Sequence, residues 1–172
     1  MNCSKLVTAG LLLLTALGAQ AQTPPPPCQD DAYRHFDFWV GEWQVELADG
    51  TQAGANSIAP AEKGCMLTER WQSAQGGTGQ SINFYDPSRR VWRQVWVSPG
   101  VIIDIEGGLD GSSMILEGTI VYASSGARHP FRGTWTPLED GRVRQFFEEQ
   151  RSGSEWQAWF EGFYERTDPA AP

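Results

Sequence analysis

The chain has 172 residues and a formal net charge of −8, with 13 Lys and Arg against 21 Asp and Glu. This acidic balance argues against nucleic acid or an anionic membrane as a partner, because both require a basic protein surface. The length suits a single domain with a sizeable core, to which eight tryptophans can contribute.

Residues 1–21 predict a cleavable secretory signal. Lys5 provides the positive start, Leu6 to Leu17 form a short apolar core, and Ala19-Gln20-Ala21 is the cleavage site. The apolar run is about a dozen residues long, whereas a spanning helix needs about 20, so no membrane span is expected. We therefore expect an exported protein, periplasmic or extracellular after cleavage near Ala21.

The next segment, residues 22–31, is a proline-rich leader that we expect to be extended. Because Cys3 leaves with the signal, Cys28 and Cys65 are the two cysteines of the mature chain, in a compartment that permits oxidation. A disulfide between them is the economical interpretation, and two unpaired thiols are the alternative. Two cysteines and two histidines without ligand spacing give no metal site.

Residues 32–166 predict an all-β domain, followed by a disordered tail at 167–172. A short helical plug is expected at 32–40, because Phe36, Phe38 and Trp39 are too apolar to be left in water. Short runs of β-branched and aromatic residues then alternate with turn residues, a pattern typical of an antiparallel barrel or sandwich. A barrel is preferred because closure removes the exposed edges. The ten expected strands are 42–48, 53–60, 65–73, 79–85, 91–98, 101–107, 113–122, 129–137, 142–150 and 156–165.

Side-chain alternation predicts which strand faces point inward. In the first strand Trp43, Val45 and Leu47 form the apolar set and are expected inside. In the strand 142–150 one face carries Val143, Gln145 and Phe147 and the other Arg144, Phe146 and Glu148, and the pattern alone does not choose the inward face.

Several motifs carry a family resemblance. Gly41-Glu42-Trp43 resembles the G-x-W that opens the first strand of lipocalin-like barrels, and it follows the predicted plug directly. The whole arrangement is similar to a family of uncharacterised, often exported bacterial proteins of calycin-like architecture, with the signature F-D-F-W-x-G-x-W. The matching stretches are F-D-F-W-V-G-E-W-Q-V at 36–45, G-C-M-L-T-E-R-W at 64–71, S-I-N-F-Y-D-P at 81–87, W-R-Q-V-W-V-S-P-G at 92–100, R-G-T-W-T-P at 132–137 and D-G-R-V-R-Q at 140–145.

The resemblance implies a single antiparallel, ten-stranded, calycin-like barrel with a short N-terminal plug, in which Trp39, Gly41 and Trp43 close one end. It implies no activity. A more distant similarity is to the ten-stranded nitrobindin barrels, which hold haem through a histidine. Here His35 lies in the N-terminal arm and His129 at a strand start, and neither occupies the late strand where such a ligand belongs. No cofactor is therefore expected.

Polar residues that share a strand face with tryptophan suggest an interior ligand site. If they point inward, they must pair with each other, with water or with a ligand. We expect Arg132 or Arg144 to neutralise Glu69. The candidate lining, for a small and partly polar or aromatic ligand, is Glu69, Trp71, Asn83, Tyr85, Trp92, Gln94, Trp96, Arg132, Trp135, Arg144 and Gln145.

Two alternatives remain open. The first alternative to ligand binding is an enzyme that uses interior Glu, Arg and Gln groups. The second is a structural or interaction protein of the cell envelope whose barrel is filled by its own side chains. No catalytic motif supports the enzyme, so no catalytic residue is assigned. The outer face of strand 91–98 would present Val91, Arg93, Val95 and Val97, an apolar patch through which the chain could dimerise. A monomer and a homodimer are both compatible with the sequence.

Overall fold

The computed structural model describes residues 26–151, 153 and 155–167. The predicted signal at 1–21, the start of the leader and residues 168–172 lie outside this part of the chain. Thr167, which was expected to begin a disordered tail, donates its backbone N–H to the carbonyl oxygen of Glu42. None of the helices within the described ranges is long and apolar enough to cross a membrane.

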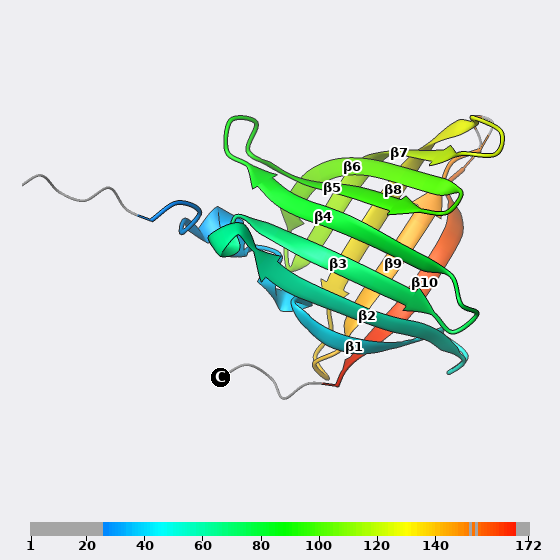
Figure 1. The fold of residues 1–172 in the computed structure, drawn as a ribbon, viewed down its shortest axis with the longest axis horizontal. Helices are drawn as coiled ribbons and strands as arrows, with labels where there is room; N and C mark the ends of the chain where they lie inside the picture. Colours follow the sequence, from blue (N-terminus) through cyan, green and yellow to red (C-terminus); the bar gives the residue numbers. More distant parts are fainter. Residues whose placement is uncertain (1–25, 152, 154, 168–172) are drawn as a thin grey trace, which may run out of the picture.

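Ten antiparallel strands form one closed barrel (Figure 1), as predicted. Each strand pairs with its neighbours in the chain, and β1 pairs with β10 to complete the ring. All boundaries lie within three residues of the predicted ones. The strands are β1 (Gly41–Glu46), β2 (Gln52–Ala61), β3 (Met66–Ser73), β4 (Thr78–Asp86), β5 (Val91–Ser98), β6 (Val101–Asp110), β7 (Ser113–Tyr122), β8 (Arg128–Pro137), β9 (Val143–Glu149) and β10 (Gln157–Arg166).

An aromatic plug closes the end of the barrel at which β1 begins (Figure 1). It comprises two short 3-10 helices, η1 (Asp31–Arg34) and η2 (Asp37–Trp39), and so confirms the predicted helical plug. Phe36 and Trp39 are fully buried, stack on each other at a centroid distance of 4.9 Å, and both contact Trp135. Rings of this kind gain about 0.5–1.5 kcal/mol per pair beyond their burial, so the plug is a stabilising part of the core.

The G-x-W motif fixes the first strand against the plug. The indole N–H of Trp43 donates to the carbonyl oxygen of Trp39 at 3.0 Å, and the Arg166 guanidinium lies over the Trp43 ring at 4.2 Å. Gly41 has a φ of +149°, and a Cβ there would collide with that guanidinium. Glycine is therefore required at this position.

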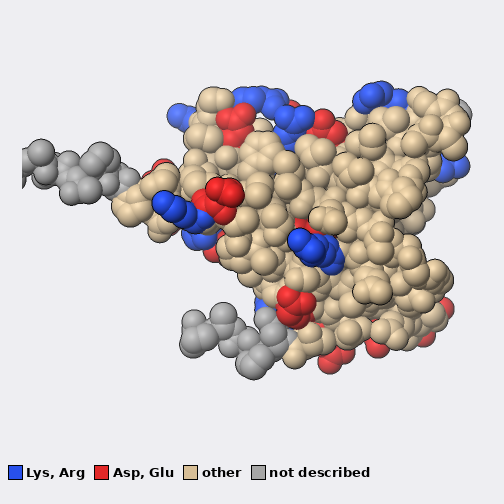
Figure 2. Space-filling model, viewed as in Figure 1, with Lys and Arg blue, Asp and Glu red and all other residues tan. Residues whose placement is uncertain are grey.

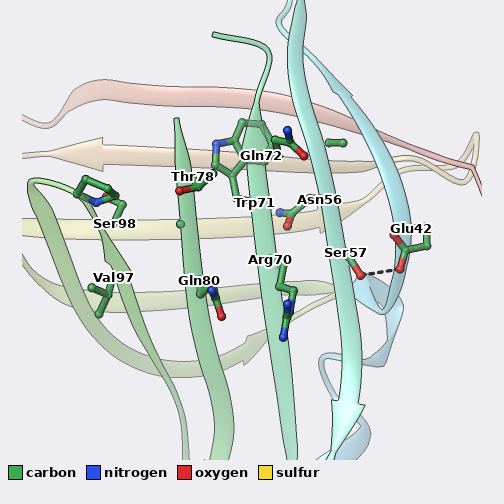
Figure 3. Close-up of a pocket in the computed structure, with 13 residues that line it drawn as sticks. Glu42, Asn56, Ser57, Arg70, Trp71, Gln72, Thr78, Gln80, Val97 and Ser98 are labelled. Atoms are coloured by element: carbon green, nitrogen blue, oxygen red, sulfur yellow. Dashed lines mark hydrogen bonds between the residues drawn. The ribbon is translucent and has the colours of Figure 1, made fainter. Parts of the chain in front are cut away.

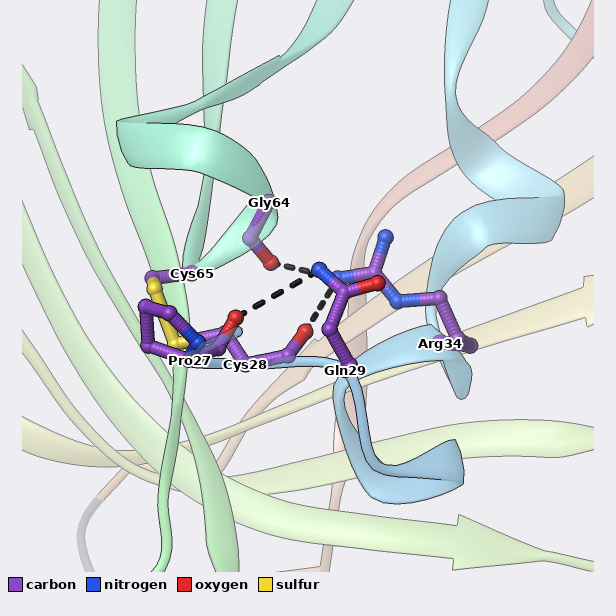
Figure 4. The surroundings of a disulfide bond; sticks show 6 residues. All are labelled: Pro27, Cys28, Gln29, Arg34, Gly64 and Cys65. Carbon is purple, nitrogen blue, oxygen red and sulfur yellow. Dashed lines mark hydrogen bonds between the residues drawn. A yellow bond between two sulfur atoms is a disulfide. The ribbon is translucent and has the colours of Figure 1, made fainter. Parts of the chain in front are cut away.

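A disulfide and an arginine attach the N-terminal arm to the barrel (Figure 4). Cys28 and Cys65 are bonded, which confirms the predicted pair. Beside them, the Arg34 guanidinium donates to the carbonyl oxygens of Cys28 and Gly64 and lies 3.4 Å from Asp37. Gly64 ends η3 (Glu62–Gly64), the turn between β2 and β3.

The expected alternation of strand faces holds for Trp43 and Val45 but ends with β1. Trp43 and Val45 are buried, but Leu47 lies beyond the strand and is 37% exposed, so its predicted inward position is wrong. In β9 the inward residues are Val143, Gln145, Phe147 and Glu149, which settles the face that the pattern left open.

The outer surface of β4–β6 carries an exposed apolar strip. Val97 of β5 is paired with Ile102 of β6, and Ile82 of β4 is paired with Val95. Ile82, Val97 and Ile102 are all more than 40% exposed. Arg93, on the same face, is paired with Asp104 at 2.8 Å. Of the predicted patch, Val97 is exposed and Val91, Arg93 and Val95 are partly buried, while the oligomeric state stays a prediction.

Removal of the disulfide should destabilise the protein by about 2 to 4 kcal/mol, because the bond closes a loop with a sequence separation of 37 residues. Urea unfolding of the oxidised protein and of the Cys28→Ala/Cys65→Ala double variant would measure this loss. Equal midpoints for the two proteins would contradict the assigned role of the bond.

Candidate functional site

The barrel interior has two different ends. At the plug end, buried aromatic side chains pack against one another. Toward the opposite end, a cavity of about 70 Å³ lies inside the barrel. Its walls are mainly apolar, and the polar groups of its lining residues are a carboxyl, an amide, a phenol and the indole N–H groups of three tryptophans. The lining residues are Glu69, Trp71, Trp96, Ile103, Gln145, Phe147, Trp159, Phe160 and Tyr164.

Glu69 is the central polar residue of this interior. It projects inward from the middle of β3 and is only 3% exposed. Its Oε1 accepts a hydrogen bond from the amide of Asn56 at 2.8 Å, and its Oε2 accepts one from the Ser81 hydroxyl at 2.6 Å. Ser81 is the direct cross-strand partner of Glu69, so the register of β3 and β4 sets this contact.

Hydrogen bonds extend from Glu69 in two directions. On one side, the Asn83 amide donates to Ser81 and the Gln94 amide donates to Asn83, each at 2.8 Å. On the other side, Asn56 also donates to the Tyr164 hydroxyl, which in turn donates to Gln145. The network thus joins six strands and satisfies most of the polar groups that burial would otherwise make costly.

Among the described residues, no arginine neutralises Glu69, contrary to the prediction. Arg132 points outward from β8, where it pairs with Glu148 at 2.7 Å and stacks on Trp156. Arg144 points outward from β9 and pairs with Glu161 at 2.6 Å. Both side chains alternate with inward residues of the same strands, so the side-chain period of two places them on the outer face.

The Glu69 carboxyl has a raised pKa, because no cation among the described residues offsets its burial. Burial raises its pKa to about 7, although the hydrogen bonds from Asn56 and Ser81 oppose the shift. Burial also raises the pKa of Tyr164 well above 10, and the nearby Glu69 charge contributes to that shift. Near neutral pH, Glu69 therefore exchanges its proton while Tyr164 stays protonated.

Other predicted lining residues support the structure elsewhere. Trp92 donates its indole N–H to the Ala32 carbonyl oxygen at 2.9 Å, and Tyr85 packs edge-on against Tyr33, so both hold the plug. Trp135 also contacts the plug. Asn83 and Gln94 belong to the buried network but do not line the cavity. Among the predicted residues, the structure brings Glu69, Trp71, Trp96 and Gln145 together at the cavity.

Trp159 is the most informative residue that the sequence did not single out. The register of β10 against β9 shifts between Ala158 and Phe160, which leaves Trp159 as an extra residue in β10. A bulge of this kind redirects a side chain. Trp159 consequently contacts Phe131 and Phe147 and lines the cavity beside Phe160, while remaining 39% exposed. It forms part of the cavity mouth.

A second buried carboxylate, Glu149, lies at the same end of the barrel but has its own partners. Its Oε2 accepts hydrogen bonds from the Tyr122 hydroxyl at 3.0 Å and from Arg151 at 2.8 Å. His129 lies 4.0 Å from its other oxygen. Neither Glu149 nor His129 lines the cavity, and His35 is exposed in the plug. The described residues contain no cluster of three or more His, Cys, Asp or Glu suited to a metal ion.

The outer surface of β2–β5 carries a wide groove of about 960 Å³ (Figure 3). Arg70, Gln72 and Gln80 line it with exposed side chains, and Arg70 is the single basic residue among the lining residues. Uncharged side chains cover most of the face drawn in Figure 2. The groove is open to solvent and lacks a buried charged group, so the interior cavity is the stronger candidate for a specific site.

The raised pKa of Glu69 predicts a specific pH dependence of stability. The folded state retains the Glu69 proton up to about pH 7, whereas the unfolded chain loses it near 4.5. The Glu69 proton thus stabilises the folded state fully below pH 4.5. This stabilisation of about 3 kcal/mol is lost as pH rises through 7. Urea unfolding at pH 5 and pH 8 should show a smaller decline for Glu69→Gln than for the wild type. Parallel declines in the two proteins would refute the assignment.

Comparison with protein-family models and with curated proteins finds no match to this chain. The family resemblance carried by the six motifs therefore stays a prediction. What the geometry identifies is a closed, antiparallel, ten-stranded barrel of calycin-like architecture.

Proposed function

We propose that this protein is an exported binding protein that holds a small, partly polar or aromatic ligand in the interior of its barrel. The observation that carries the proposal is the cavity beside Glu69, where a buried carboxyl group meets aromatic walls. Ligand sites combine apolar walls with a few placed polar groups in this way. The Cys28–Cys65 bond supports export, since such bonds persist mainly in oxidising compartments.

The lining favours binding over catalysis. Among the described residues that line the cavity, there is one carboxyl group and no histidine, cysteine or serine. Tyr164 keeps its proton at neutral pH because burial raises its pKa well above 10. General acid–base catalysis needs groups that exchange protons near the working pH, and Glu69 alone meets that condition.

The size of the cavity limits the part of a ligand that it can enclose. Sites for drug-sized ligands usually measure about 300–1,000 Å³, well above the 70 Å³ found here. We infer that a small head group enters beside Glu69 and that the remainder of the ligand lies at the mouth. Trp159, Trp71 and Trp96 are the large side chains available there.

A panel of small compounds tests the binding function. Phenol, benzyl alcohol, indole, benzylamine, benzoate and octanoate represent the neutral, cationic and anionic classes. At least one should change the tryptophan fluorescence and raise the melting temperature, since a ligand at 100 times its Kd stabilises a protein by about 2.7 kcal/mol. A panel without any effect at millimolar concentration would contradict the proposal.

Two tryptophan variants locate the binding. Trp159→Ala should weaken the binding of the active compound by about tenfold, because Trp159 lines the cavity. Trp156→Ala is the matched control, since Trp156 stacks on Arg132 at the outer surface and does not line the cavity. Equal losses in the two variants would place the ligand elsewhere.

A further inference from the structure

The interior carboxyl group lacks a partner of opposite charge. Glu149, the other buried carboxylate, has Arg151 at 2.8 Å. Glu69 has only neutral hydrogen-bond donors, namely Asn56 and Ser81. Within the described residues, no Lys, Arg or His lines the cavity. When Glu69 ionises, its charge is therefore left without a cation from the protein.

The groups in direct contact with Glu69 leave it with unused acceptor sites. A carboxylate offers about four lone-pair sites, and two of those on Glu69 are used. The Asn56 amide nitrogen donates to both Glu69 and Tyr164, whereas its Oδ1 is buried and has no partner. The Ser81 and Tyr164 hydroxyl groups already donate to acceptors. A ligand that fills the remaining acceptor sites of the Glu69 carboxylate must bring donors.

The cavity walls suit a cation better than an anion. Trp71, Trp96, Phe147, Trp159 and Phe160 supply aromatic rings. Ring faces carry partial negative charge and attract ammonium groups by about 0.5–2 kcal/mol. An anion would face these rings and the Glu69 carboxylate with no basic residue to balance its charge.

We propose that the ligand of this cavity is a small organic ammonium ion, a protonated primary amine whose N–H groups bind the Glu69 carboxylate. This inference rests on the proposed binding function and specifies its ligand class. An ammonium group brings three donors and the missing charge. It is also small enough for a cavity of about 70 Å³, with the organic part of the molecule lying at the mouth.

Binding requires an ionised Glu69, and the proton balance is simple. An ammonium ion that binds the protonated site displaces the Glu69 proton to solvent, and no covalent bond forms or breaks. The groups that face Glu69 from the packed strands are Asn56, Ser81, Gln145 and Tyr164, of which only Tyr164 titrates, far above neutral pH. Amine affinity should therefore rise with pH across the range around 7.

Three compounds of similar shape test the ligand class. Isothermal titration calorimetry at pH 6 and pH 8 would compare 2-phenylethylamine, 2-phenylethanol and 3-phenylpropionate. At pH 8 the amine should bind at least about tenfold more tightly than the alcohol, and the carboxylate should not bind. Between pH 6 and pH 8 the Kd of the amine should fall about tenfold as Glu69 ionises, while that of the alcohol should not change.

Variants assign the effect to Glu69. Glu69→Gln should lower amine affinity by at least about tenfold and remove its pH dependence, while the alcohol still binds. Glu148→Gln is the control, because it removes an equal charge from the outer face of β9, where Glu148 pairs with Arg132. Its amine affinity should match that of the wild type. Should Glu69→Gln fail to fold, the three compounds and the pH series on the wild type still test whether the ligand is an ammonium ion.

The outcomes separate the two proposals. Equal affinity of the wild type for the amine and the alcohol, or tighter binding of the carboxylate, would overturn the ammonium assignment and leave the interior as a binding site. Unchanged amine affinity in a folded Glu69→Gln variant would also overturn the ammonium assignment without contradicting the interior binding site. If neither these compounds nor the wider panel bind the wild type, both proposals fail.

Discussion

Pairing of β1 with β10 turns ten consecutive hairpin-linked strands into a ring, and the other features of the molecule depend on that ring. Closure divides every strand into an inner and an outer face, so each side chain is committed to the core or to solvent. It also forces large rings into a narrow space. Glycines accommodate them, as at Gly79, whose missing side chain leaves room for the Trp96 ring.

The interior uses this space in two ways. Near η2, the rings of Phe36, Trp39 and Trp135 pack against one another and provide stability. Toward the opposite end, a hydrogen-bonded chain surrounds a carboxyl group whose burial is unfavourable. An apolar residue would fill a purely structural core at lower free-energy cost. The position of Glu69 is therefore the main support for the proposed interior ligand.

The sequence predicted the architecture well because the signals were local. Turn residues, alternation and the G-x-W motif define ten strands and a plug, and two cysteines define one disulfide.

The interior site was predicted only in part. Alternation alone shows that Arg132 cannot share a face with Trp135, nor Arg144 with Gln145, but in β9 only the structure shows which of the two residues points inward. Trp159 could not be found in this way, since it enters the cavity through a bulge that depends on pairing with β9. The pairing of Asn56 with Tyr164 depends on the closed ring and has no local signal.

Both ends of the described chain lie at the plug end of the barrel (Figure 1). Cys28 is fixed there by its bond to Cys65, and Thr167 is hydrogen-bonded to the first strand at Glu42. The cavity mouth lies at the opposite end, near Trp159. A surface or fused domain placed directly beside Cys28 or Thr167 would consequently lie at the plug end and leave the opening of the barrel accessible to small molecules in solution.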